Sequence, residues 1–202
     1  MNRKTLLIIV LCTELLIGIG LLSATFRSSD PSPTPETPWK VWQGSDVKIS
    51  YPPDFTAYEG ESAHGGLIGR PIVTFAFPLG SFSAPKTNYG EAYLAISQTQ
   101  TAEEARDCFT NAHGGNPESG FGSTVFIHGV EFRKALAVDP AAGNIYASEV
   151  YRTIRNGSCY ELALTVHTGN IYNYDPGTVV EFDKEQAFGT LRMIRDTFVF
   201  TK

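Results

Sequence analysis

The dipeptide Asn156-Gly157 constrains the fold of this chain more than any other local feature. It separates two long alternating segments, YASEVYRTIR and SCYELALTVH. Asn and Gly both tolerate positive φ, so the pair favours a two-residue type I′ turn between antiparallel strands. This turn sets the register, in which Arg155 faces Ser158 and Arg152 faces Glu161. The sequence therefore predicts a long β-hairpin with an opposed Arg–Glu pair.

Both faces of the predicted hairpin carry apolar side chains. One face collects Tyr151, Tyr160, Leu162, Leu164 and Val166, and the other carries Val150, Ile154, Cys159 and Ala163. A sheet that is apolar on both sides is usually covered on both sides. A cross-strand Arg–Glu pair is expected to stabilise the hairpin by a few tenths of a kcal/mol, on the order of the contribution of other cross-strand pairs. The hairpin is thus expected to lie inside a layered domain.

Two amphipathic helices are predicted to supply that cover. The first spans Thr101–Phe109, where Thr101 and Glu104 form a capping box, and the second spans Asp183–Arg195, which Asp183 caps. Further strands are expected at 46–51, 72–77, 92–98 and 197–200, with two short strands within 125–138. The predicted fold class is α+β, with a central antiparallel sheet flanked by helices on both faces, an α-β-α sandwich.

The N-terminal segment predicts the subcellular location of the protein. Residues 5–24 form an apolar run long enough to span a bilayer, with Arg3 and Lys4 before it. We expect residues 1–26 to be a transmembrane signal anchor with a cytoplasmic N-terminus and an extracytoplasmic domain. The alternative is a secretory signal cleaved after Ala24, which would release the protein. Glu14 lies within the run and disfavours the anchor.

A Pro/Ser/Thr-rich linker is expected over residues 27–38, and a single domain over residues 39–202. The domain holds two cysteines, Cys108 and Cys159. In an exported domain such a pair most simply forms a disulfide, and the predicted helix could bring Cys108 onto the hairpin face that carries Cys159. Two buried free thiols are the alternative.

The motif SYPPDF at the first strand and the helix running into LRMIRDTFVF resemble the PsbP-like fold, shared with the Ran-release-factor proteins. The chain also resembles anchored extracytoplasmic domains of unknown function from bacteria. The resemblance implies a central antiparallel sheet with helices on both faces. It also implies a non-catalytic role, as an assembly factor, binding module or lipoprotein, and it assigns no functional residue.

Charge argues against a nucleic-acid partner. Removing the three cations and two acids of residues 1–30 from the totals of 16 and 21 leaves 13 Lys+Arg and 19 Asp+Glu. No basic cluster is present that could neutralise phosphates. The chain also has no GxSxG elbow, phosphate-binding loop, dinucleotide fingerprint or closely spaced histidine pair. We therefore expect no enzyme activity, cofactor or metal.

The segment GNIYNYDPG at 169–177 is the candidate recognition loop. Its composition is typical of protein or glycan contacts, and its candidate contact residues are Asn170, Tyr172, Asn173, Tyr174 and Asp175. The alternative is a packed loop whose tyrosines cover the sheet edge. The predicted function is a membrane-tethered domain that binds a protein or envelope component. The alternative function is a carrier or sensor of a small apolar ligand or lipid, held between sheet and helix.

Overall fold

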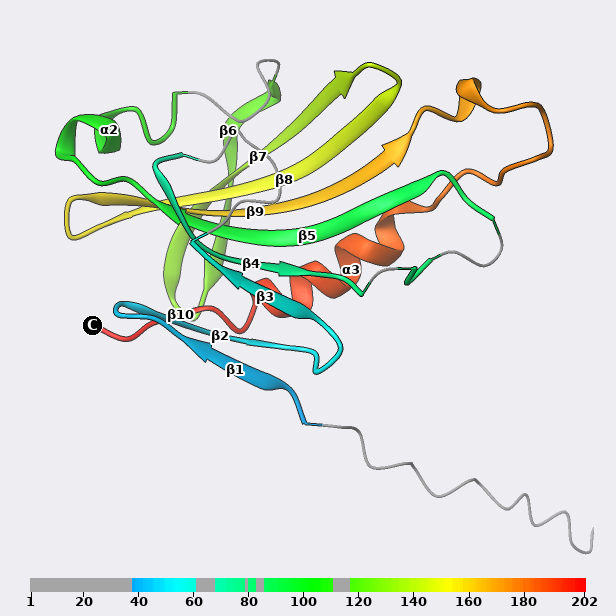
Figure 1. The fold of residues 1–202 in the computed structure, drawn as a ribbon. Coiled ribbons are helices and arrows are strands. Elements are labelled where there is room, and N and C mark those ends of the chain that lie inside the picture. The colour runs from blue at the N-terminus through cyan, green and yellow to red at the C-terminus, as the bar shows by residue number, and fades with distance from the viewer. Residues whose placement is uncertain (1–37, 61–67, 79, 83–85, 111–116) are drawn as a thin grey trace, which may run out of the picture. The chain divides into compact units, whose positions relative to one another are not determined.

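The computed structural model describes residues 38–60, 68–78, 80–82, 86–110 and 117–202 (Figure 1). The chain divides into a unit over residues 1–36 and a compact unit over residues 37–202. The predicted anchor over residues 1–26 lies outside the described residues, as does the predicted linker except for its last residue. Within the described part, no helix has the length and apolar character needed to cross a membrane.

A seven-stranded antiparallel sheet forms most of the domain, in the order β3-β4-β5-β9-β8-β7-β6. Its strands are β3 (Thr56–Glu59), β4 (Arg70–Ala76), β5 (Tyr89–Gln98), β6 (Pro117–Ile127), β7 (Val130–Ala141), β8 (Asn144–Arg155) and β9 (Ser158–Gly169). Figure 1 shows that β5, β7, β8 and β9 are long, strongly curved strands. Strands therefore dominate the domain.

The predicted hairpin is confirmed as β8 and β9. Asn156 and Gly157 have φ values of 51° and 78°, as a type I′ turn requires. The pairing runs from Arg155 opposite Ser158 to Asn144 opposite Gly169 without a shift. Twelve residues of each strand therefore follow the register that the turn predicted.

The two strands predicted around His128 are β6 and β7, and both are longer than expected. His128 and Gly129 form the turn between them with φ values of 46° and 79°. Register shifts at Ser119 interrupt the first half of β6, while its residues 123–127 pair regularly with β7. Such shifts bend a strand and increase its twist.

A second, three-stranded sheet has the order β1-β2-β10. It consists of β1 (Lys40–Gln43), β2 (Val47–Tyr51) and β10 (Val199–Phe200). Val47 and Ile49 point from β2 into the main core, where Phe198 is also buried. This small sheet joins the two ends of the domain, because β2 lies near its start and β10 near its end.

Helix α3 (Lys184–Arg195) covers one face of the large sheet (Figure 1). The Asp183 carboxylate caps it by accepting from the Glu185 amide. Leu191 and Ile194 are fully buried against β9 and β5. Helix α3 confirms the predicted second helix and its buried stripe.

The predicted α-β-α sandwich is wrong. The described residues contain two sheets and only two α-helices, and α2 (Ala102–Arg106) spans five residues instead of the nine expected. The capping box of Thr101 with Glu104 is present, but the helix ends at Arg106. On the face opposite α3, the bent strand β6 supplies Phe121, which packs on Ala135, Ala137 and Val150. Curvature of the sheet and one short helix therefore replace a helical layer.

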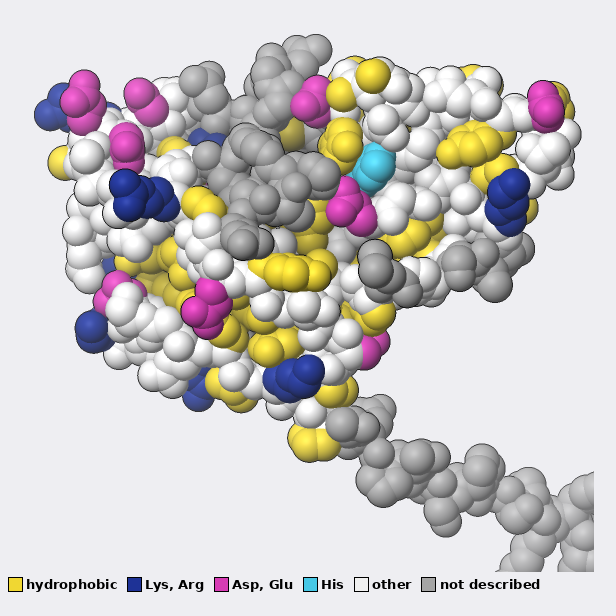
Figure 2. All heavy atoms as spheres, viewed as in Figure 1, with side chains coloured by type: hydrophobic (Ala, Val, Ile, Leu, Met, Phe, Trp, Pro, Cys, Tyr) yellow, Lys and Arg dark blue, Asp and Glu magenta, His cyan; other side chains and the backbone are white. Residues whose placement is uncertain are grey.

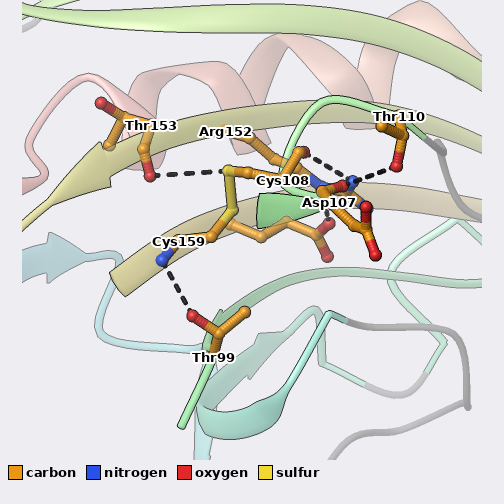
Figure 3. The surroundings of a disulfide bond; sticks show 8 residues. Thr99, Asp107, Cys108, Thr110, Arg152, Thr153 and Cys159 are labelled. Carbon is orange, nitrogen blue, oxygen red and sulfur yellow. Dashed lines mark hydrogen bonds and ion pairs between the residues drawn. A yellow bond between two sulfur atoms is a disulfide. The ribbon is translucent and has the colours of Figure 1, made fainter. Parts of the chain in front are cut away.

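The predicted Cys108–Cys159 disulfide is present, with a Cα–Cα distance of 5.6 Å (Figure 3). It ties the segment after α2 to β9, and both cysteines are fully buried. Thr99 supports the β9 side, because its hydroxyl accepts from the Cys159 amide at 2.9 Å. On the other side, Arg152 donates to the Cys108 carbonyl at 2.9 Å. The disulfide is thus embedded in hydrogen bonds to its neighbours.

Candidate functional site

The predicted recognition loop follows β9 and begins with a short 3-10 helix, η1 (Ile171–Asn173). The Asn170 side chain caps η1 by accepting from the Tyr172 amide at 3.1 Å. The Asn170 amide and the Asn173 side chain both donate to the Gly143 carbonyl, at 2.8 Å and 3.1 Å. Two of the five candidate residues therefore fix the loop to the β7–β8 turn.

The two tyrosines of the loop have different surroundings. Tyr172 projects almost completely into solvent, with 91% of its surface exposed, whereas Tyr174 is 39% exposed. The Tyr174 hydroxyl lies against Gly169, where an added Cβ would be only 2.5 Å from it. The glycine thus makes room for the Tyr174 ring on the sheet face opposite α3.

His167 lies two residues before Gly169 and therefore on the same sheet face. Its ring stacks on Tyr146 across the hairpin, with centroids 4.4 Å apart and an interplanar angle of 11°. His167 Nε2 lies 2.9 Å from Asn144 Oδ1, and Nδ1 lies 3.5 Å from a carboxylate oxygen of Glu91. The ring is therefore fixed on its stacked face and at both nitrogens.

A glycine also makes room for this histidine. A Cβ on Gly90 would lie 2.5 Å from His167 Nδ1. Gly90 coincides with the register shift between Tyr89 and Glu91 in β5, and Glu91 pairs directly with His167. We refer to Asn144, Tyr146, His167, Tyr172 and Tyr174 together as the tyrosine–histidine surface.

Further along β9, the sheet face that carries His167 is lined by buried polar side chains. The Ser148 and Thr165 hydroxyls are 2.9 Å apart. Tyr93 pairs with Thr165, and burial raises the pKa of its phenol to about 12. The phenol is therefore protonated at neutral pH. The tyrosine–histidine surface is the more accessible end of this polar face.

Only part of this surface was predicted from the sequence. The composition of the loop predicted its candidate residues. In the structure Asn170 and Asn173 make hydrogen bonds that hold the loop, whereas Tyr172 and Asp175 are exposed. Tyr146, His167 and Asn144 were missed. The hairpin register contains the signal that finds them, because its extension places Tyr146 opposite His167.

The tyrosine–histidine surface offers ring faces and the Asn144 amide, with the Glu91 carboxylate beside it, but it contains no serine or cysteine that could act as a nucleophile. Both cysteines of the domain are in the disulfide. Within the described residues, no group of three or more His, Cys, Asp or Glu side chains could hold a metal ion. On the face shown in Figure 2, cations and acids are interspersed with uncharged side chains. The arrangement suits contact with a partner through stacking and hydrogen bonds.

A separate hollow of about 190 Å³ lies beside β10. Ile127, Val130, Arg155, Phe198 and Phe200 contribute to its lining. It is smaller than the roughly 300–1,000 Å³ of most small-molecule sites. It also lies away from the contact between α3 and the sheet, where a carried ligand was expected.

No family model matches the chain, and no curated protein matches its sequence. A Bacteroides thetaiotaomicron protein of known structure is similar over 77% of this chain and 45% of its own, with 16% identity and a TM-score of 0.40. This chain thus spans less than half the length of that protein. LpqN, a protein involved in cell envelope biogenesis of Mycobacterium tuberculosis, is similar over 82% of this chain and 91% of its own, with 13% identity and a TM-score of 0.43. Likenesses this distant carry no argument about function, and none of these comparisons supports membership of the PsbP-like family.

Proposed function

We propose that this chain is a non-catalytic binding domain, tethered outside the cytoplasm by residues 1–26. In this proposal it binds a protein or another cell-envelope component through the tyrosine–histidine surface. One observation carries the proposal: Tyr172 is 91% exposed on a loop whose backbone is held by its neighbours. A large, rigidly presented tyrosine favours binding, because little conformational entropy is lost when it is covered.

The neighbouring groups extend the contact area around Tyr172. The stacked Tyr146–His167 pair adds ring surface, and Tyr174 remains partly exposed. Aromatic side chains with a polar tip are enriched where proteins contact their partners. The surface therefore combines apolar area with hydrogen-bond groups.

Two further features support the proposed membrane tether and the proposed location outside the cytoplasm. The apolar run over residues 5–24 has the length of a membrane span. The Cys108–Cys159 disulfide is typical of domains that fold outside the reducing cytoplasm. Both features support an extracytoplasmic domain.

The carrier alternative has less support. Ala187, Leu191 and Ile194 of α3 are fully buried, and so are Leu162 and Leu164 beneath them. These side chains bury one another in the contact between helix and sheet, which supports a packed core there. We therefore favour the binding surface over an internal pocket.

Site-specific photo-crosslinking in cells of the source organism tests the proposal. A benzophenone amino acid replaces Tyr172 in the full chain, and the matched control replaces Met193, which is 54% exposed on α3. We expect a discrete crosslinked product from position 172 and none from position 193. Gly169→Ala, which displaces the Tyr174 ring, should weaken the product. Equal products from both positions, or none from position 172, would contradict the proposal.

A further inference from the structure

Strand β6 is an edge of the seven-stranded sheet, because among the described residues β7 alone pairs with it. Its residues 123–127, with the sequence STVFI, are paired regularly with β7 on one side. Ser123, Thr124 and Phe126 are exposed, and Phe126 has 68% of its surface in solvent. This part of the edge is therefore open to another chain.

The β6–β7 turn determines which backbone groups face outward. In a two-residue hairpin the residues that flank the turn, here Ile127 and Val130, form a hydrogen-bonded pair. Hydrogen-bonded and non-bonded pairs alternate along the ladder, so Val125 also directs its amide and carbonyl to β7. Thr124 and Phe126 consequently direct theirs away from the sheet. These two residues offer two donors and two acceptors at the open edge.

The usual devices that protect a sheet edge are missing from this segment. Between Glu118 and Glu131 the chain has no Lys, Arg, Asp or Glu. Exposed edges are normally blunted by charges, prolines or bulges, because an unprotected edge recruits another strand. The register shifts of β6 lie before residue 123, so they protect only its first half. The opposite edge, β3, carries Glu59.

We propose that residues 123–127 of β6 pair with the same residues of a second copy of this chain. The two strands run antiparallel about a twofold axis through Val125, which places Thr124 opposite Phe126 of the second copy. These are the residues whose backbone groups face outward, so the pairing forms two hydrogen-bonded pairs. An uncharged strand suits this occupant, because self-pairing brings no like charges together.

Side chains on both faces fit this register. On one face Phe126 covers the small Thr124 of the second copy, which removes exposed aromatic surface from water. On the other face the two Val125 side chains meet across the axis. The interface is small, so we expect weak association that depends on concentration.

Cysteine crosslinking tests the register in the full chain, in a Cys12→Ser background that removes the third thiol. In a non-hydrogen-bonded antiparallel pair the Cβ atoms are about 5 Å apart, so Val125→Cys should form an intermolecular disulfide. The control Ser123→Cys places its two thiols four residues apart along the strand, about 13 Å, and should not crosslink. Crosslinking of Ser123→Cys equal to that of Val125→Cys would overturn the register.

Sedimentation of the full chain in detergent tests the dimer without a thiol. We expect a monomer–dimer equilibrium, weakened at least tenfold by Phe126→Lys, which places like charges near the axis. Tyr58→Lys on the opposite edge β3 is the control and should leave the equilibrium unchanged. Unchanged melting temperatures would show that both variants are folded. A monomer at all concentrations, or equal effects of the two substitutions, would refute the proposal.

Discussion

Arg152 and Glu161 face each other across the β8–β9 hairpin, with 2.6 Å between Nε and Oε2. Both side chains are almost entirely buried, at 3% and 0% exposure. The guanidinium group also donates to the Cys108 carbonyl and lies 4.8 Å from the centre of the Phe121 ring. The register of this pair followed from the turn, but its burial did not, and burial changes its energetic role.

Breaking the buried pair should be far more costly than the few tenths of a kcal/mol expected for an exposed one. Glu161→Leu leaves the Arg152 charge uncompensated, so we expect the free energy of unfolding to fall by about 3–5 kcal/mol. The double variant Arg152→Met/Glu161→Leu should recover most of that loss, because both charges are gone. Urea unfolding of the three proteins measures these differences. A cost below about 1 kcal/mol for the single variant would contradict the prediction.

Glu149 should make the domain sensitive to acid. Burial alone would raise its pKa, but hydrogen bonds from Arg192, Lys134 and Tyr151 outweigh burial and lower the pKa from 4.5 to about 2. A lowered pKa means that this stabilisation is complete above about pH 4.5 and is lost as the pH falls towards 2. The shift corresponds to a free energy on the order of 3 kcal/mol.

Glu149→Gln is the matched test of this pH dependence. We expect the variant to be less stable than the parent at pH 7 and to approach it as the pH falls from 5 to 2. Urea unfolding at several pH values measures the difference between the two proteins. A difference that stays constant over this range would show that Glu149 does not titrate as described.

Removing the disulfide should destabilise the domain. Cys108 and Cys159 are 51 residues apart in sequence, and a crosslink over a loop of this length restricts the unfolded chain by about 4 kcal/mol in the chain-entropy model. We expect Cys108→Ala/Cys159→Ala, and the reduced parent, to unfold at clearly lower urea concentrations. The control Cys12→Ser should have no effect. Identical unfolding curves with and without reductant would contradict this expectation.

Gly189→Ala should stabilise the domain. Gly189 lies inside α3, and an added Cβ would meet no atom within 4 Å. Alanine in a helix interior is favoured over glycine by about 0.5–1 kcal/mol, because less backbone entropy is lost on folding. A rise in the melting temperature measures this gain. Gly169→Ala is the contrasting substitution, because its Cβ would lie 2.5 Å from the Tyr174 hydroxyl and the ring would have to move, so no such gain is expected.

Local patterns were sufficient wherever neighbours in sequence or in a hairpin decide the structure. The Asn156-Gly157 turn predicted the pairing of β8 with β9, including the Arg152–Glu161 pair. The capping residues Thr101 and Asp183 lie where the helices begin. The composition of the loop also identified Tyr172, which is 91% exposed beside the partly exposed Tyr174.

The cover of the second sheet face could not be predicted in the same way. Two apolar faces indicate that something covers both, but they do not distinguish a helix from a bent strand. The bulges of β6 bring Phe121 over Val150, and no periodic pattern signals this contact. The prediction of an α-β-α sandwich was wrong because the sequence did not show that a bent strand covers the second face.

By itself, the sequence determined the hairpin register, the helix starts and the partners of the disulfide, because these follow from turn chemistry, capping and cysteine number. Only the tertiary structure decided which polar residues are buried and which stay accessible. Burial depends on residues brought together from distant segments, as when Arg152 meets Phe121 and Glu149 meets Arg192. The strand order of the large sheet likewise leaves β6 at an edge within the described residues.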